Sequence, residues 1–226
     1  MSILEAKEVS KSYRIGDIPI PVLERVSLAV REGEFIVIEG ESGSGKTTLL
    51  SLLSGLDKPT SGRILVEERD ITDLREDQLA VMRNETIGFV FQSFHLVPSL
   101  TAIENISFPA ELKGDRGARS KARTLLERTG LEERRLSFPH QLSGGEKQRV
   151  AICRALINEP RIVFADEPTG NLDGANGKAV LELLLGLRRE RATTLVLVTH
   201  SKEIAKLADR VVFLRNGAIG GDGEKG

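Results

Sequence analysis

The chain has 226 residues, of which 40% are hydrophobic and 29% are charged. This is the composition of an ordinary globular protein, long enough to bury a substantial core. Its 32 basic and 33 acidic residues give a formal net charge of −1, so no global field would attract nucleic acid or an anionic membrane, and any anion site must be local. The apolar stretches are far shorter than the roughly 20 residues that a membrane span needs.

The N-terminal sequence and the single cysteine indicate the cellular compartment and exclude a disulfide. Acidic Glu5 and Glu8 stand where a signal peptide needs a positive region followed by an apolar one, so export is not expected and the cytoplasm is the default compartment. Cys153 is the only cysteine, which excludes an intramolecular disulfide. We expect it to pack on an apolar helix. We expect the last six residues to be disordered.

Short β-branched runs alternate with helical patterns, which predicts an α/β fold with a mostly parallel core sheet. Two runs, FIVIE and IVFAD, are nearly continuously apolar, as strands covered on both faces should be. Three early segments alternate like antiparallel strands and would form a smaller sheet beside the core: residues 3–9, 22–30 and 63–67. The core strands are expected at residues 35–39, 87–91, 162–165, 194–199 and 211–214.

Between about residues 92 and 160 the strand signals vanish and helical patterns take over. We expect helices at residues 101–112, 119–129 and 146–158. Two of them begin with capping-box pairs, Thr101 with Glu104 and Ser143 with Glu146. We interpret this stretch as a helical lobe inserted in a single domain, residues 1–226.

Residues 40–47, GESGSGKT, satisfy the pattern G-x-x-x-x-G-K-[ST] directly after the expected strand 35–39 and before a helical run. This is the context of a phosphate-binding loop. Glycines let backbone N–H groups converge on phosphates, and the helix N-terminus adds its dipole. Lys46 would reach the terminal phosphates, and the Thr47 hydroxyl would ligate Mg²⁺. The predicted nucleotide contacts here are Gly40, Ser42, Gly43, Ser44, Gly45, Lys46, Thr47 and Thr48.

A second element of the same chemistry is the run RIVFADE, residues 161–167, in which an apolar strand ends in two carboxylates. Asp166 is suited to hold the Mg²⁺ shell and Glu167 to polarise an attacking water. Together with a phosphate-binding loop in the same chain, this pair indicates phosphoryl transfer, which needs charge neutralisation and water positioning together.

Residues 142–148, LSGGEKQ, resemble the signature motif of ATP-binding-cassette (ABC) proteins, and with them the chain is similar to an ABC-transporter nucleotide-binding domain over essentially its whole length. Ser143 would cap a helix, and Gly144 and Gly145 would leave its first N–H groups unobstructed, which makes a second anion site. The resemblance implies ATP and Mg²⁺ as ligands. It also implies a head-to-tail homodimer in which the signature of one subunit closes over the ATP held by the other.

The resemblance assigns four further positions. Tyr13 matches the aromatic residue that stacks on adenine, with an ordinary surface tyrosine as the alternative. Gln92 matches the glutamine that senses Mg²⁺ and water and links the core to the helical lobe. Asp173 matches a loop that crosses the dimer interface, and His200 matches the histidine that contacts the γ-phosphate.

Three positions have no such role. His95 and His140 have no neighbours at metal-ligand spacing and are expected to be structural or solvated. Ser201 stands where many relatives carry Asp, and because serine can cap the following helix we expect little functional consequence.

In the implied mechanism, Glu167 orients water for in-line attack on the γ-phosphate, while Lys46 and His200 stabilise the developing charge. Gln92 would transmit the closure of the dimer to the helical lobe. The helical lobe would carry this motion to integral membrane permease subunits. The chain would sit on them as a peripheral protein of the inner membrane and would touch neither nucleic acid nor cargo.

The stretches GFVFQSFHLVPSLTAIENI and FADEPTGNLD are similar to those of the LolD, MacB and FtsE group, which serves lipoprotein release, efflux and cell division. An FtsE-like division ATPase remains the alternative. ABC ATPases of the DNA-repair type carry a long coiled coil between the phosphate-binding loop and the carboxylate pair. That type is disfavoured because the sequence between Lys46 and Asp166 contains no sustained heptads. A cassette that binds ATP without turnover is disfavoured because Glu167 and His200 are both present.

Overall fold

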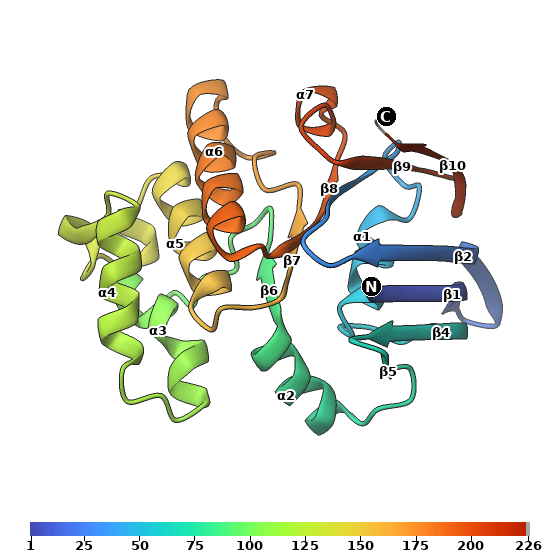
Figure 1. Ribbon diagram of the computed structural model, residues 1–226, viewed down its shortest axis with the longest axis horizontal. Coiled ribbons are helices and arrows are strands. Elements are labelled where there is room, and N and C mark those ends of the chain that lie inside the picture. The colour runs from blue at the N-terminus through green and yellow to red at the C-terminus, as the bar shows by residue number, and fades with distance from the viewer. Residues whose placement is uncertain (225–226) are drawn as a thin grey trace. The chain divides into compact units, whose positions relative to one another are not determined.

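The structure is a computed structural model and describes residues 1–224 (Figure 1). This part of the chain divides into two units. Unit 1 consists of residues 1–83 and the segment from Thr194 onward, and unit 2 of residues 84–193. The α/β fold class is confirmed, with parallel strands, an antiparallel sheet and a helical region. That residues 1–226 act as one domain, with a helical part at about 92–160, stays a prediction. Within the described residues, no helix is both long and apolar enough to span a membrane.

The core strands of unit 1 are parallel. β3 (Phe35–Glu39) pairs on one side with β8 (Thr194–Thr199) and on the other with β9 (Arg210–Arg215). Almost every side chain of β3 and β8 is buried, which is why both sequences are continuously apolar. The predicted bounds of these two strands are confirmed. Two helices complete this part, α1 (Lys46–Leu53) after β3 and α7 (Lys202–Ala205) after β8.

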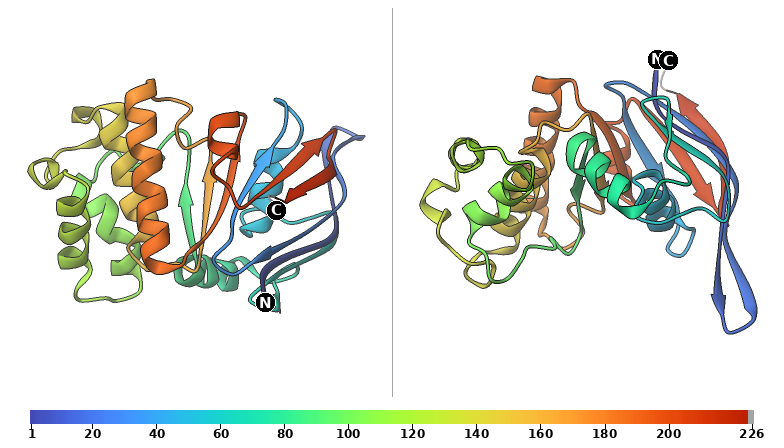
Figure 2. Two further views of the ribbon diagram at one scale, coloured as in Figure 1. Left: turned by 45° about the horizontal axis from the view of Figure 1, so that its top comes forward. Right: turned by 90° about the horizontal axis from the view of Figure 1, so that it is seen from below.

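The smaller antiparallel sheet of unit 1 is also confirmed. Its strands are β1 (Ser2–Ile15), β2 (Ile18–Arg31), β4 (Ser61–Val66) and β5 (Arg69–Asp70), in the order β2-β1-β4-β5. β1 pairs with β4 only as far as Ser10, while its pairing with β2 continues to Ile15. The end of the β1–β2 hairpin is therefore two-stranded, and it is the blue arm that extends beyond β4 in the right view of Figure 2.

The expected disorder at the C-terminus is wrong for the residues that the structure describes. β10 (Ala218–Glu224) runs antiparallel to β9, with Gly223 opposite Val211. Pairing of this kind is made by backbone groups, so a glycine-rich segment without an apolar pattern can still form an edge strand. Lys225 and Gly226 lie outside the described residues.

Unit 2 contains two parallel strands, β6 (Ile87–Val90) and β7 (Ile162–Asp166). Three of its helices pack on one another around a buried apolar cluster, which includes Ile106, Leu126 and Val150. Both predicted capping boxes are present, at Thr101 and at Ser143. The helices of this part are α3 (Ala102–Leu112), α4 (Ala118–Arg128), α5 (Gly144–Leu156) and α6 (Gly174–Arg191), with short 3-10 turns at Glu132–Arg134 and Pro139–Gln141.

Helix α2 (Glu76–Thr86) runs from the end of the first part of unit 1 into the start of unit 2. Neither α2 nor α6 was expected from the sequence.

Candidate active site

The phosphate-binding loop joins β3 to α1 in unit 1. Gly43 and Gly45 adopt positive φ angles of 80° and 98°, which L side chains rarely adopt. No side chain caps the N-terminus of α1, as expected where a helix end is offered to an anion. Lys46 Nζ donates to the carbonyl oxygens of Gly40 and Glu41, each at 2.8 Å. The ammonium group is thereby held against the loop, where it can meet a phosphate.

Close packing fixes the shape of this loop. A Cβ on Gly40 would lie 2.4 Å from the carbonyl oxygen of Leu214 and 2.6 Å from Ser44 Oγ. Ser44 Oγ is buried and has no hydrogen-bond partner within the described protein. A buried hydroxyl without a partner is costly, so a ligand that bonds to it would stabilise this arrangement. The loop therefore fits a phosphate group.

His200 lies at the same sheet edge as this loop. Glu39 is opposite Thr199 in the parallel β3–β8 pair, so the residues that follow them, Gly40 and His200, leave the sheet at one edge. His200 is exposed. Ser201 caps α7, because its side chain accepts a hydrogen bond from the N–H of Ile204, and the predicted capping role of this serine is confirmed.

The carboxylates of the second motif lie in unit 2. Val90 of β6 is opposite Ala165 of β7, so Asp166 at the end of β7, Glu167 and Gln92 lie at the carboxyl ends of these two strands. Both carboxylates are half-buried. Glu167 has a φ of 43°, a left-handed conformation that is uncommon for a residue other than glycine and that often marks a functional position.

The Gln92 loop is tied to the loop before α6. Gln92 Nε2 donates to Asn171 Oδ1 at 3.3 Å, and Asn171 Nδ2 donates to the Gln92 carbonyl oxygen at 3.0 Å. A Cβ on Gly170 would come within 2.8 Å of Gln92 Nε2, so the glycine allows this approach. Movement of one loop would therefore be felt by the other.

Gln148 is a residue for which the sequence analysis assigned no role. It is fully buried on α5, and its Nε2 donates to the carbonyl oxygen of Pro168 at 2.7 Å and to that of Phe91 at 3.5 Å. It thus joins the backbone just after Glu167 to the backbone just before Gln92. Its helical spacing from the buried residues Gly145 and Ile152 is the signal that could have found it.

The signature motif forms the N-terminus of α5. Ser143 Oγ accepts from the N–H of Glu146 at 3.3 Å, and a Glu146 oxygen accepts from the N–H of Ser143 at 2.8 Å. A Cβ on Gly144 would lie 3.3 Å from Leu172 Cδ2, and one on Gly145 would lie 3.1 Å from Asn176 Oδ1. The first turn of α5 therefore packs against residues 171–176.

Asp173 is the N-cap of α6. Its carboxylate accepts from the N–H of Asn176 at 3.0 Å and from Asn176 Nδ2 at 2.7 Å. The backbone hydrogen bond is the main reason that the pKa of Asp173 is lowered. This cap gives the residue a structural role, and the predicted role at a dimer interface stays a prediction.

Two other histidines lie against aromatic rings. His95 stacks on Phe91 with ring centroids 4.4 Å apart, and the carbonyl oxygen of His95 accepts from Arg154 at 2.5 Å. His140 lies with its ring centroid 6.0 Å from that of Phe138. Both histidines are also exposed, and these observations agree with the expectation that they are structural or solvated.

A phosphate-binding loop after one parallel strand and a carboxylate pair after another define a P-loop ATPase. Comparison with known proteins gives the family. The family described as ABC transporter matches residues 23–170. The lipoprotein-releasing system ATP-binding protein LolD of Idiomarina loihiensis is 45% identical and is covered over 96% of both chains. The macrolide export ATP-binding/permease protein MacB of Syntrophobacter fumaroxidans is 48% identical over 97% of this chain, which spans 31% of that protein's length.

Solved structures agree with these relatives. A dimeric ATP-binding cassette in a post-hydrolysis state bound to ADP and Pi matches with a TM-score of 0.92 and 40% identity, over 99% of each chain. A dimeric structure of a bacterial ABC transporter cassette matches equally well. The chain belongs to the ABC transporter family, as an ATP-binding and ATP-hydrolysing subunit. The family inferred from residues 142–148, and the similarity to LolD and MacB, are confirmed.

Proposed function

We propose that the chain energises an integral membrane permease of the lipoprotein-release or MacB-like efflux type. The proposal is supported by the functions for which similar proteins are named. LolD is named for lipoprotein release and MacB for macrolide export, and the chain matches both at 45% identity or more. The chain would be held at the inner membrane by these permease subunits and would not touch the cargo itself.

The working unit in this proposal is a head-to-tail homodimer. The single observation that carries it is that the chain has two glycine-rich helix N-termini, at α1 and at α5. Each is suited to an anion. The dimeric structures of similar cassettes support pairing of two copies. ATP on the phosphate loop of one subunit would then be covered by Ser143, Gly144 and Gly145 of the other.

The chemical step would be carried by the chain's own carboxylate and cationic groups. Glu167 orients a water for in-line attack on the γ-phosphate, and Lys46 and His200 stabilise the negative charge that develops. Hydroxyl and carboxylate oxygens suit Mg²⁺, so Thr47 and Asp166 would hold it, with Gln92 near its water shell. Bound Mg²⁺ would neutralise phosphate charge.

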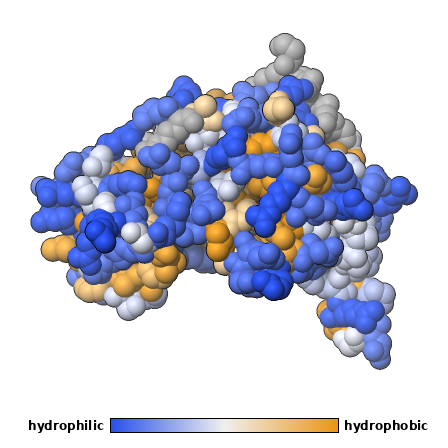
Figure 3. Space-filling model, turned by 60° about the horizontal axis from the view of Figure 1, so that its bottom comes forward, coloured by the Kyte–Doolittle hydropathy of each residue, from blue (hydrophilic) through white to orange (hydrophobic). Residues whose placement is uncertain are grey.

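The helical region of unit 2 is the proposed contact with the permease. Figure 3 shows hydrophobic side chains gathered on the helical region at its left. On α3, Phe108 is 44% exposed and Leu112 is 66% exposed, and larger apolar patches of this kind often mark interaction sites. Gln92 and Gln148 would pass nucleotide-dependent changes on to these helices.

The test of this function is the ATPase activity of the wild type beside Glu167→Gln, with sizing chromatography in ATP and Mg²⁺. The variant keeps a side chain of the same shape but cannot act as a carboxylate base. We expect loss of turnover by at least about a hundredfold and accumulation of an ATP-bound dimer. Glu133→Gln, which changes an exposed glutamate of unit 2, is the matched control and should hydrolyse ATP like the wild type. Turnover by Glu167→Gln at the wild-type rate would contradict the proposed role of Glu167 in hydrolysis.

A further inference from the structure

Tyr13 lies on a part of β1 that the sheet supports on one side only. It pairs with Ile20 of β2, and β4 has already left β1 at Ser10. A two-stranded hairpin is marginally stable in water. A ring carried on it would sample several positions unless other groups held it.

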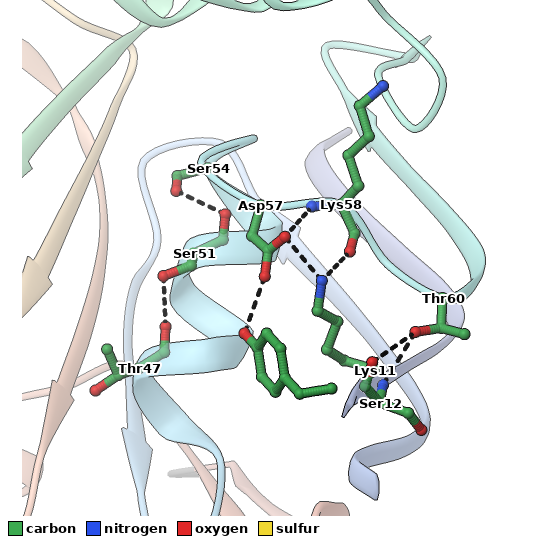
Figure 4. Close-up of polar contacts among 9 residues, drawn as sticks. Lys11, Ser12, Thr47, Ser51, Ser54, Asp57, Lys58 and Thr60 are labelled. Carbon is green, nitrogen blue, oxygen red and sulfur yellow. Dashed lines mark hydrogen bonds and ion pairs between the residues drawn. The ribbon is translucent and has the colours of Figure 1, made fainter. Parts of the chain in front are cut away.

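Residues 57–60 supply that support. The N–H of Ser12 donates to Thr60 Oγ1 at 3.0 Å, and the N–H of Thr60 donates to the carbonyl oxygen of Ser10 at 2.8 Å. Figure 4 shows the contact between Ser12 and Thr60 next to the contacts that Lys11 and Asp57 make. The segment therefore flanks β1 where β4 no longer does.

Asp57 is the centre of this contact. Its Oδ2 accepts from the Tyr13 hydroxyl at 2.9 Å, and its Oδ1 accepts from Lys11 Nζ at 2.7 Å and from the N–H of Lys58 at 2.7 Å. Both carboxylate oxygens are thus engaged by donors, and charge-assisted bonds of this kind are the stronger ones. The hydrogen bond to Asp57 therefore fixes the position of the Tyr13 hydroxyl.

Lys11 completes the arrangement from one side of the ring. It is only 9% exposed, its ammonium also donates to the carbonyl oxygen of Lys58 at 2.6 Å, and it lies 4.8 Å from the centroid of the Tyr13 ring. A cation in this position is attracted to the ring face. Tyr13 itself remains 43% exposed, so the ring still offers apolar surface to a ligand.

The protonation states fit these donors and acceptors. Burial, followed by the Asp57 carboxylate, raises the pKa of the Tyr13 phenol, which keeps its proton available for donation. Burial alone would raise the pKa of Asp57, but the hydrogen bonds from Lys11 and Tyr13 outweigh it and the pKa is lowered.

Asp57 is also tied to the helix that carries the phosphate loop. Its N–H donates to the carbonyl oxygen of Ser51 in α1 at 3.2 Å. Ser51 Oγ in turn donates to the carbonyl oxygen of Thr47 at 2.9 Å. Helix α1 therefore begins at the phosphate loop, and Ser51 in its last turn holds the backbone of Asp57, so the helix links the phosphate loop to the residue that binds the Tyr13 hydroxyl.

We propose that Asp57, held in place by Lys11, is a positioning residue that fixes the Tyr13 ring for stacking against the adenine base of ATP. The inference rests on the proposed contact between Tyr13 and adenine and extends it. Asp57 does not touch the nucleotide in this account. Its effect should appear only for ligands that carry a base.

The test compares binding of ATP and of inorganic tripolyphosphate by calorimetry for four proteins: wild type, Asp57→Ala, Tyr13→Phe and the double variant. We expect each single variant to weaken ATP binding about three- to tenfold, the usual worth of one such hydrogen bond. Binding of tripolyphosphate should not change, and the double variant should bind ATP no more weakly than Asp57→Ala alone. Lys58→Ala, which changes an exposed side chain of the same segment, is the control and should bind both ligands like the wild type.

Equal weakening of both ligands by Asp57→Ala would overturn the proposal, because it would indicate a general effect on the loop. Unchanged ATP binding would overturn it as well. If Asp57→Ala does not fold, Tyr13→Phe carries the test, since it removes only the phenolic hydroxyl and keeps the ring. Tyr13→Ala separates the two claims: if it weakens ATP binding while Asp57→Ala does not, only the positioning role fails, and if it has no effect, the contact between Tyr13 and adenine fails first.

Discussion

Burial decides the chemistry of Cys153. The side chain lies on α5 inside the helical core of unit 2, with Sγ 3.6 Å from Thr129 Oγ1, and the expectation of a packed cysteine is confirmed. Burial raises the pKa of this thiol to about 12. Because the thiolate is the reactive form, the folded protein should not react with an aromatic disulfide reagent near pH 8. The same protein in denaturant should release one equivalent of chromophore. Reaction of the native protein at the rate of a free thiol would contradict this.

Glu146 couples the signature helix to pH. The N–H of Ser143 donates to the Glu146 carboxylate. This hydrogen bond lowers the pKa of Glu146, and its effect is larger than the opposing effect of burial. A carboxyl whose pKa is lower in the folded state contributes stability above its unfolded pKa, near 4.3, and loses that contribution as the pH falls through the folded value.

Glu146→Gln keeps an oxygen that can accept the same hydrogen bond but removes the charge, so it should lower the free energy of unfolding by about 0.3–1 kcal/mol near neutral pH. The difference from the wild type should shrink as the pH falls below the ordinary pKa of glutamate, because the wild-type carboxyl then becomes neutral as well. Urea unfolding of both proteins, at neutral pH and at a pH below the ordinary pKa of glutamate, measures this difference in unfolding free energy. A gap that does not depend on pH would mean that charge plays no part in this cap.

At the scale of elements, one buried amide joins α3 to the loop before it. Asn105 is 1% exposed, and its Oδ1 accepts from the N–H of Val97 at 2.7 Å. Its Nδ2 donates to the carbonyl oxygens of Val97, Leu100 and Thr101. The amide thus satisfies backbone groups of the loop between β6 and α3, and it holds residues 97–101 of that loop against the first turn of α3.

Asn105→Asp should cost about 2–4 kcal/mol of unfolding free energy, since it removes these donors and turns a buried carboxylate toward carbonyl oxygens. Asn216→Asp, an exposed turn residue with positive φ, is the matched control and should change stability by less than about 0.5 kcal/mol. Thermal or urea unfolding compares the two. Equal effects would show that the buried amide does not hold the loop.

Local patterns explain which elements could be predicted. The strands at residues 35–39 and 194–199 are continuously apolar and buried, and the capping boxes are short motifs, so each signal lies within a few neighbouring residues. α2 buries only Leu79 and Met82, too few for an apolar stripe. α6 is interrupted by Gly177 and Gly186, and glycine lowers helix propensity.

The same distinction holds for the site. The phosphate loop, the carboxylate pair and the signature are contiguous motifs, and their residues could be named from sequence and family resemblance. Lys11, Asp57 and Gln148 could not, because each acts through hydrogen bonds to groups far away in the chain: Lys11 to Asp57, and Gln148 to Phe91 and Pro168. Such partners are far apart in the sequence and come together only in the fold, so no local sequence pattern identifies them.

At the scale of the whole molecule, the proposed mechanism requires two copies of the chain to share each ATP. The chain has a phosphate loop in one unit and a signature helix in the other, and in the proposed dimer the phosphate loop of one copy and the signature helix of the other would form one site. Symmetric pairing of two chains would then build two equal composite sites.

Mixing two inactive variants tests this claim most directly. Lys46→Ala damages the phosphate loop and leaves the signature intact, while Ser143→Arg blocks the N-terminus of α5 and leaves the phosphate loop intact. Each should be inactive alone. In a mixed dimer, one site receives both intact halves, so an equal mixture should recover about a quarter of the wild-type ATPase activity. A mixture as inactive as its components, although co-purification through different tags shows that mixed dimers form, would contradict the shared site.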